Sequence, residues 1–165
     1  MQQYLLGPEL GCGAFSIVYE GKSRDIGEQY AVKIIDKTEL YESELEAMTV
    51  EASILQKLNH PHVIRLYDVF DEKRYIYMVL EKMSGGELFD RIVQKQSYNE
   101  EDARRTCKII MQAIKHCHDK KIAHRDLKPE NLLLQVRPAC GVLGGRRRVS
   151  HHFRFSALIT TSTSN

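Results

Sequence analysis

Two short segments near the start of the sequence hold residue types that suit phosphate binding. Gly11-Cys12-Gly13 lets the backbone approach a polyphosphate closely and turn its N–H groups toward the charge. Lys33 lies in an otherwise apolar run, residues 30–35, where a buried ammonium group needs an anionic partner. Glu51, midway along the next predicted helix, is the candidate partner. These residues predict a site for a phosphate ligand.

A third segment, residues 124–131, reads His-Arg-Asp-Leu-Lys-Pro-Glu-Asn. It groups Asp126, Lys128 and Asn131 within six positions. The three residues supply a proton acceptor, a phosphate-binding cation and an oxygen ligand for a hard metal ion. Because a random charged loop rarely reproduces all eight residues, this segment indicates phosphoryl-transfer chemistry.

The first two segments also have ordinary structural interpretations when each is taken by itself. The glycines can form a simple hairpin turn, and Lys33 can extend its stem to the surface. A Rossmann turn is disfavoured, because the strand-forming residues 17–19 follow the glycines where that turn needs a helix.

The elements that must position these residues are strands first and helices afterwards. The patterns predict strands over residues 4–16, 17–21, 29–35, 63–70 and 75–80. They predict a helix from a Thr38 cap to about Leu58, a short helix over 87–95, and a longer one over 100–120 capped by Asn99. This order predicts an α+β protein with an antiparallel sheet at its start.

The longer helix carries an apolar stripe, which predicts that two of the four cysteines are buried. The stripe consists of Ala103, Cys107, Ile110, Met111, Ile114 and Cys117. No pair of cysteines has CxxC spacing, so we expect free thiols and no metal site built on them.

The composition limits the class of protein. The 165 residues suffice for one domain with a core, and 42% hydrophobic with 28% charged residues disfavours a disordered or fibrous chain. No window approaches the roughly 18 apolar residues of a membrane span, and residues 1–6 do not resemble a signal peptide. We therefore expect an intracellular, cytoplasmic protein that binds neither membranes nor nucleic acid.

The end of the chain differs from the rest in charge. No Asp or Glu follows Glu130, whereas residues 135–165 contain five arginines. Gly144-Gly145 and a polar finish indicate weak structure, so we expect residues 135–165 to form a divergent, basic, disordered tail. Within it, Arg147-Arg148-Val149-Ser150 has the pattern of a site for a basic-directed kinase.

Taken in their order along the chain, the three motifs resemble those of the eukaryotic protein kinases. The resemblance covers residues 4–134, and Lys128-Pro129 is similar to the serine/threonine class. The stretch 81–89 is similar to the calcium/calmodulin-dependent kinase group. Ser16 stands where the family has a third loop glycine. The resemblance implies a five-stranded antiparallel N-lobe with its αC helix over about 1–80, a hinge over about 81–86, and a partial helical C-lobe over 87–134.

The resemblance also implies a role for each matching residue in an ATP site. Gly11 and Gly13 would hold the phosphates, with Lys33 on the α- and β-phosphates and Glu51 holding Lys33. The adenine slot would be formed by Val18, Ala31 and Leu133, with Met78 at its rear, Glu81 and Met83 on the hinge, and Glu87 near the ribose or a basic substrate. Asp126 would accept the proton of the substrate hydroxyl, Lys128 would hold the γ-phosphate, and Asn131 would bind Mg²⁺.

Other parts of the family's pattern are not found in residues 135–165. These are Asp-Phe-Gly, the activation loop and Ala-Pro-Glu, so the magnesium site is expected to be incomplete. The resemblance implies ATP-dependent phosphorylation of Ser or Thr in protein substrates, with ATP and Mg²⁺ as cofactors and weak or no activity in this chain. The alternatives are a catalytically dead module that binds nucleotide or a partner, and an unstable truncated product that self-associates.

Overall fold

The computed structural model describes residues 1–13, 15–94, 99–124, 127–143, 146–155 and 160–161, and within them side chains up to Gln135, apart from Glu130. The chain divides into two compact units. Unit 1 comprises Met1–Asn59 and Arg65–Lys82, and unit 2 comprises His60–Ile64 and Met83–Asn165. No helix in the described ranges is long and apolar enough to cross a membrane.

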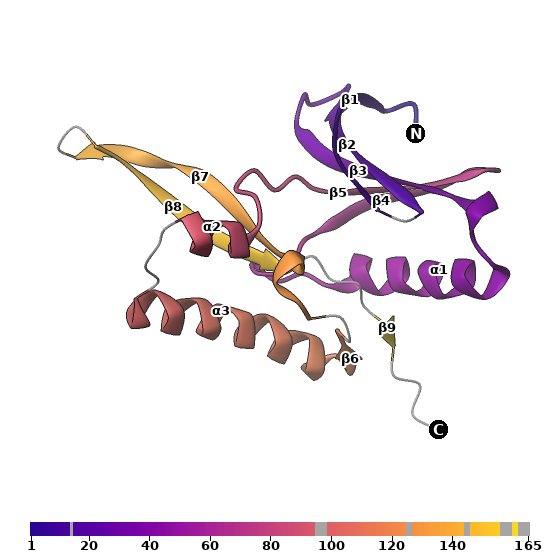
Figure 1. Ribbon diagram of the computed structural model, residues 1–165. Coiled ribbons are helices and arrows are strands. Elements are labelled where there is room, and N and C mark those ends of the chain that lie inside the picture. Colours follow the sequence, from indigo (N-terminus) through magenta and orange to yellow (C-terminus); the bar gives the residue numbers. More distant parts are fainter. Residues whose placement is uncertain (14, 95–98, 125–126, 144–145, 156–159, 162–165) are drawn as a thin grey trace. The chain divides into compact units, whose positions relative to one another are not determined.

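Unit 1 is built on one five-stranded antiparallel sheet (Figure 1). Its strands are β1 Tyr4–Gly13, β2 Ser16–Ser23, β3 Gln29–Asp36, β4 Leu66–Asp71 and β5 Tyr75–Glu81, in the spatial order β1-β2-β3-β5-β4. The five predicted strands and their antiparallel pairing are therefore confirmed.

Alternation along β3 gives this sheet two different faces. Val32 and its cross-strand partner Val79 are fully buried, and Tyr4, Phe70 and Tyr77 pack around them. The intervening positions of β3, which include Lys33, belong to the opposite face. That opposite face is also apolar beside Lys33, because Ile35, Ile76 and Met78 are buried there.

The connection from β3 to the first long helix differs from the prediction. A short 3₁₀ helix, η1 Lys37–Glu39, comes first, and α1 spans Glu42–Lys57 with Tyr41 as its N-cap residue. The prediction that Thr38 caps the long helix is wrong, because the Asp36 carboxylate accepts a hydrogen bond of 3.0 Å from the Thr38 N–H and closes a separate short turn.

Asp36 also joins this connection to the β4–β5 turn. Arg74 Nε and Nη2 donate to Asp36 Oδ2 at 3.1 and 2.8 Å. The Arg74 guanidinium, followed by the Thr38 hydrogen bonds, lowers the pKa of Asp36 from 3.8 to about 2. The carboxylate thus fixes the turn that leads into α1.

We expect Asp36→Asn to lower stability near neutral pH and to lose this effect in acid. A carboxyl whose pKa is lowered on folding contributes stability above its ordinary pKa of 3.8 and loses it as the pH falls toward about 2. Thermal unfolding of wild type and Asp36→Asn between pH 7 and pH 2 measures the difference. Arg74→Gln should reproduce most of it, and a difference that does not change with pH would contradict the assignment.

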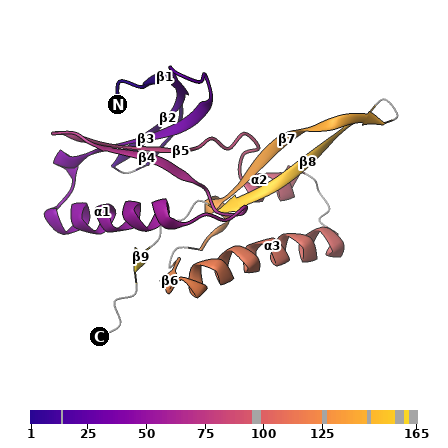
Figure 2. The same ribbon diagram turned by 180° about the vertical axis from the view of Figure 1, so that it is seen from behind.

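The described part of unit 2 contains helices and a long hairpin (Figure 2). Its elements are α2 Leu88–Gln94, α3 Glu100–Asp119, β6 Ile122–Ala123, η2 Pro129–Asn131, β7 Leu132–Leu143, β8 Arg146–Phe155 and β9 Thr160–Thr161. The predicted cap of α3 is confirmed, because Asn99 Oδ1 accepts a hydrogen bond of 2.7 Å from the Asp102 N–H.

The buried face of α3 agrees with the predicted stripe only in part. Thr106, Ala113 and Cys117 are buried, whereas Cys107 is exposed and Met111 is 63% exposed. The prediction that both cysteines are buried is therefore wrong for Cys107. By hydropathy, Cys107 is expected to be buried in preference to its neighbour Thr106, but the packed face of α3 buries the small Thr106 side chain.

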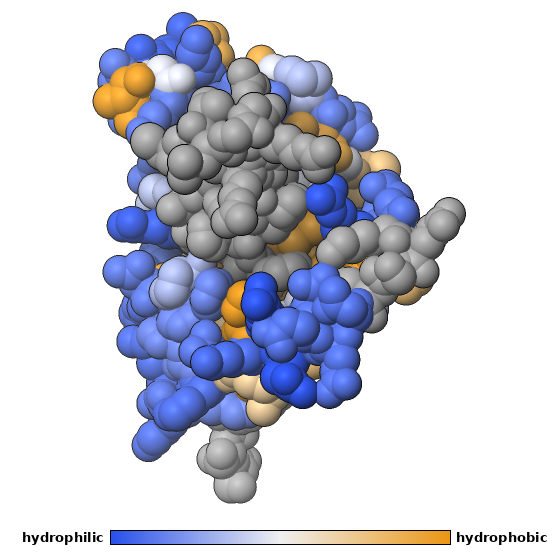
Figure 3. All heavy atoms as spheres, turned by 90° about the vertical axis from the view of Figure 1, so that its left-hand side faces the viewer, coloured by the Kyte–Doolittle hydropathy of each residue, from blue (hydrophilic) through white to orange (hydrophobic). Residues whose placement is uncertain are grey.

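Cys117, the other cysteine of the predicted stripe, is buried as expected. Burial raises the pKa of the Cys117 thiol, as is typical of a structural cysteine. Among the described residues on the face in Figure 3, hydrophilic side chains predominate, with small hydrophobic patches between them.

The end of the chain also differs from the expected disordered tail. β7 and β8 pair in antiparallel fashion, from Leu132 opposite Phe155 to Leu143 opposite Arg146. In the sequence, Gly144-Gly145 stands between these two segments, and a Gly-Gly pair is a typical hairpin signal. The prediction of a disordered tail gives more weight to the basic composition of residues 135–165. Gln135, where the predicted tail begins, therefore lies inside β7 of unit 2.

Candidate functional site

The sheet of unit 1 places predicted site residues from four strands in one row. Gly11 is paired with Val18, Val18 with Lys33, and Lys33 with Met78. Residues directly opposite each other on paired strands lie on the same face, a few ångströms apart. Ala31 is two residues before Lys33 and so shares its face. The fold thus brings together residues that are far apart in the sequence.

The space around this row can accept a ligand at its glycine end. A Cβ atom added to Gly11 would meet no atom within 4 Å, and one added to Gly13 would lie 3.3 Å from Ser16 Oγ. Met78 is buried, whereas Val18, Ala31 and Lys33 are half-buried and reachable. The open position at Gly11 and the ammonium group of Lys33 fit a phosphate group.

Lys33 and Glu51 are both half-buried, on β3 and α1. The pairing of the two side chains that the resemblance implies stays a prediction.

Glu81 is the last residue of β5. It lies opposite Tyr30 in the register, and its backbone N–H donates a hydrogen bond of 2.9 Å to the Arg65 carbonyl. This bond fixes the end of the strand where the hinge is predicted to begin.

Unit 2 brings a second group of predicted residues together. Glu87 and Leu133 form an antiparallel β-bridge, although they are distant in the sequence. Beside it, the Gly85 N–H donates to the Leu134 carbonyl at 2.7 Å, and the Leu134 N–H donates to the Gly86 carbonyl at 2.9 Å. The segment that carries Met83 and Glu87 is thus held against the strand that carries Leu133.

Glycine is required twice in this segment. A Cβ atom on Gly85 would lie 2.6 Å from both the Cβ and the carbonyl oxygen of Leu134, so no side chain fits without a backbone shift. Gly86 has φ of +72°, in the region that favours glycine. The two glycines therefore allow the close backbone contact with the strand that carries Leu134.

The third motif is described in part. Lys128 is exposed and directly precedes η2, and the Asn131 N–H donates a hydrogen bond of 3.0 Å to the Lys128 carbonyl. Asp126 lies outside the described residues. Within the described ranges, no three His, Cys, Asp or Glu side chains are placed to hold a metal ion. Asn131 as a magnesium ligand therefore stays a prediction.

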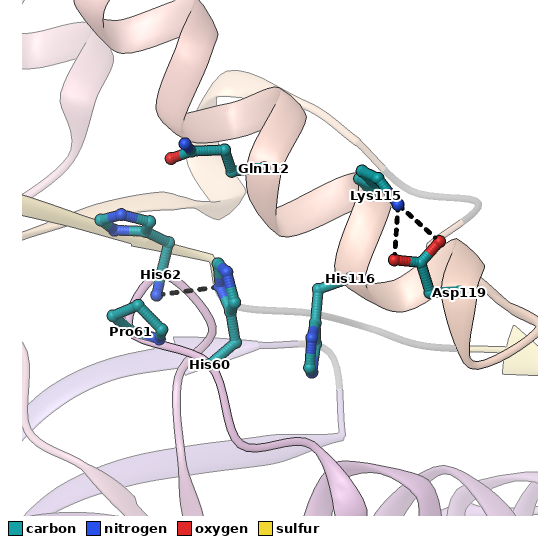
Figure 4. A pocket seen from close by; sticks show the side chains of 7 residues that line it. All are labelled: His60, Pro61, His62, Gln112, Lys115, His116 and Asp119. Atoms are coloured by element: carbon teal, nitrogen blue, oxygen red, sulfur yellow. Dashed lines mark hydrogen bonds and ion pairs between the residues drawn. The ribbon is translucent and has the colours of Figure 1, made fainter.

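Sequence reasoning missed a cavity of about 410 Å³ in unit 2 (Figure 4). It is lined by His60, Pro61, His62, Gln112, Lys115, His116 and Asp119. The rings of His60 and His116 are stacked with their centroids 4.8 Å apart, and the His62 N–H donates a hydrogen bond of 3.2 Å to His60 Nδ1. These histidines form no recognisable motif in the sequence, because His60 and His62 are far from His116 along the chain. The fold brings the 60–64 loop against α3.

Comparison with known proteins agrees with the motifs. The family model for the protein kinase domain matches residues 4–140. Myosin light chain kinase A of Dictyostelium discoideum is 48% identical over 132 residues, covering 80% of this chain and 45% of that protein. Calcium/calmodulin-dependent protein kinase type 1 of Caenorhabditis elegans is 47% identical over 133 residues, covering 80% of this chain and 38% of that protein.

A solved structure shows the same fold. The crystal structure of Rad53 1-466 in complex with AMP-PNP matches with a TM-score of 0.76 and 36% sequence identity, over 81% of this chain and 36% of the Rad53 chain. The chain spans less than half the length of the curated relatives named above.

Proposed function

The chain belongs to the protein kinase family, and from this premise we propose that its residues bind ATP and take part in transferring the γ-phosphoryl group to Ser or Thr hydroxyls of proteins. The row formed by Gly11, Val18, Lys33 and Met78 across the sheet of unit 1 carries the proposal. It combines a place for backbone N–H groups, a cation and apolar side chains on one face. The N–H groups and the cation suit the phosphates of a nucleotide, and the apolar side chains suit its base.

The proposed roles divide between the two units. In unit 1, Gly11 and Gly13 hold the phosphates, Lys33 neutralises part of their charge, and Glu51 orients Lys33. Val18, Ala31 and Met78 contact the adenine, and Glu81 offers a hinge backbone group to it. For unit 2, the family resemblance assigns Met83 to the hinge, Leu133 to adenine binding, and Glu87, which is bridged to Leu133, to the ribose or a basic substrate.

ATP supplies the phosphoryl group, and the residues of the third motif are proposed to act on the acceptor hydroxyl, the γ-phosphate and the metal ion. Asp126 takes the proton of the Ser or Thr hydroxyl, and Lys128 holds the γ-phosphate. Asn131 donates one oxygen ligand to Mg²⁺, which needs several more. Positioning and charge neutralisation account for most of the catalysis in such a site.

The finer functional assignments rest on the similarity to particular relatives. We infer membership of the calcium/calmodulin-dependent kinase group from the identity to a type 1 kinase of that name and to a myosin light chain kinase. An intracellular, cytoplasmic location and a preference for basic substrates belong to the same proposal.

A second candidate function is a module that binds nucleotide or a partner protein without transferring phosphate. It is favoured by one feature of the sequence, since no Asp or Glu follows Glu130. These 165 residues thus hold no counterpart of the Asp in the family's Asp-Phe-Gly motif. Exposed apolar side chains in unit 2, Phe89, Val93 and Met111, support the further proposal that the chain self-associates.

Calorimetric titration with ATP and adenosine tests the nucleotide site. Wild type should bind both ligands in competition, and Ala31→Leu should lose at least about tenfold in affinity for both, because the added side chain occupies the adenine slot. Ala47→Leu makes the same change at an exposed position of α1 and should leave both affinities unchanged. Full binding by Ala31→Leu, or no binding by wild type, would contradict the proposed site.

A further inference from the structure

We propose that Ser150 is a phosphorylation site for a basic-directed protein kinase acting on this chain from outside, and that its phosphate stabilises the β7–β8 hairpin. Two independent observations carry the proposal: the arginines that precede Ser150 in the sequence, and the arginine that β7 places opposite it. The site does not depend on whether this chain itself transfers phosphate.

The first step is recognition of the segment by the modifying enzyme. Arg147 and Arg148 stand three and two positions before Ser150. Guanidinium groups pair with carboxylates through two parallel hydrogen bonds, so an enzyme with acidic residues in its peptide groove selects such a segment. β8 already has the extended backbone that a peptide groove requires.

The second step is access to the segment. β7 and β8 form a two-stranded sheet. The segment with Gly85 and Glu87 pairs only with the start of β7, at Leu133 and Leu134, and within the described residues no third strand pairs with the part around Ser150. A two-stranded sheet has an open edge along each strand and is marginally stable by itself. Local opening around Ser150 therefore has a low free-energy cost, as expected for a segment that an enzyme must bind.

The third step is the environment of the phosphate. Ser150 is paired with Arg137 in the register, and His152 is paired with Gln135. Directly opposite positions have Cα atoms roughly 4.5–5.5 Å apart. Arg148 and His152, two residues away along β8, share the face of Ser150 by strand alternation. The register therefore gives the Ser150 position a cross-strand arginine.

Charge gives the phosphate a stabilising effect. Residues 135–165 contain five arginines and no Asp or Glu, so the hairpin has an excess of positive charge. A phosphoserine carries roughly −1.5 to −2 charges at neutral pH and accepts charge-assisted hydrogen bonds from guanidinium groups. Phosphorylation of Ser150 thus offsets part of this charge at a position opposite Arg137 in the register.

The chemical step is a transfer from ATP supplied with the modifying kinase. The bond between the γ-phosphorus and the β–γ bridging oxygen breaks, and a bond forms between that phosphorus and Ser150 Oγ. The hydroxyl proton passes to a base of the modifying kinase, and ADP leaves with the former bridging oxygen.

Labelling of the 165-residue chain tests the site. The chain is incubated with ATP, Mg²⁺ and an active kinase that selects arginine three positions before serine, and phosphate is located by mass spectrometry. We expect phosphate on Ser150 in wild type and none at this position in Ser150→Ala. Arg147→Ala should lower the rate of labelling by at least about tenfold. The matched control Arg154→Ala removes an arginine that follows Ser150, and it should label within about twofold of wild type. Phosphate only on other residues, or labelling of Ser150 unaffected by Arg147→Ala, would overturn the proposal.

Hydrogen exchange of the same protein tests the effect on the hairpin. Amides of β7 and β8 should exchange about three- to tenfold more slowly after phosphorylation, and Arg137→Gln should remove most of this protection without preventing labelling. Arg146→Gln, at a position opposite Leu143, serves as the control and should retain it. Unchanged or faster exchange in the phosphorylated chain would overturn the stabilising role.

Discussion

Lys33→Ala is expected to weaken ATP binding by about 10- to 100-fold and to leave adenosine binding within about twofold. The Lys33 position lies between Val18 and Met78 in the row of site residues, near the open space at Gly11. A hydrogen bond between an ammonium group and a phosphate contributes about 1.5–3 kcal/mol, and about 1.4 kcal/mol corresponds to a factor of ten in affinity. Adenosine has no phosphate and so loses nothing. Calorimetry with both ligands measures the two affinities.

The control for this experiment is Lys22→Ala, which removes an exposed lysine from β2 of the same sheet. It changes the net charge equally and should leave both affinities within about twofold of wild type. Equal losses for ATP and adenosine in Lys33→Ala would show that Lys33 supports the fold or the adenine slot and does not bind phosphate.

The 165-residue chain is expected to transfer phosphate at least about 1,000-fold more slowly than the roughly 1–100 turnovers per second typical of protein kinases. Transfer needs a metal ion held by several oxygen ligands, but of these only Asn131 is predicted in the described part of the chain, and no Asp or Glu follows Glu130 in the sequence. For the same reason, Mg²⁺ should change the ATP affinity by less than about threefold. Radiolabelled ATP with a basic Ser-containing peptide measures the rate.

The variant Asp126→Ala separates residual catalysis from background. Because Asp126 is the proposed proton acceptor, the rate that this variant retains is background and not catalysis by the proposed site. Turnover in the usual range, together with its loss in Asp126→Ala, would show that these residues form a working site, and the non-catalytic alternative would be excluded.

Local patterns in the sequence were sufficient to predict the family and the main architecture. The five strands, the antiparallel sheet and the Asn99 cap are confirmed, and so is the protein kinase family. Strand alternation and helix caps depend on residues within a few positions of each other, so they can be recognised without knowledge of the fold. The assigned roles of the site residues stay predictions.

Several local predictions failed because neighbouring side chains competed for the same backbone groups or the same buried space. Asp36 binds the Thr38 N–H and closes a separate short helix, so Thr38 does not cap α1. On α3, packing buries Thr106 and exposes Cys107, against the order of their hydropathy. Hydropathy records only the transfer of each side chain from water, whereas the fold also selects for size and hydrogen bonding.

The sequence by itself determined which residues are available for phosphate chemistry and in what order they occur. Only the tertiary structure decided which of them are neighbours: strand register puts Val18, Lys33 and Met78 in one row, and backbone hydrogen bonds at Gly85 and Gly86 put Glu87 beside Leu133. It also stacked His60 on His116 and paired Arg137 with Ser150. Such contacts join residues far apart in the chain, and they form because backbone groups and apolar surface must be satisfied across the whole unit.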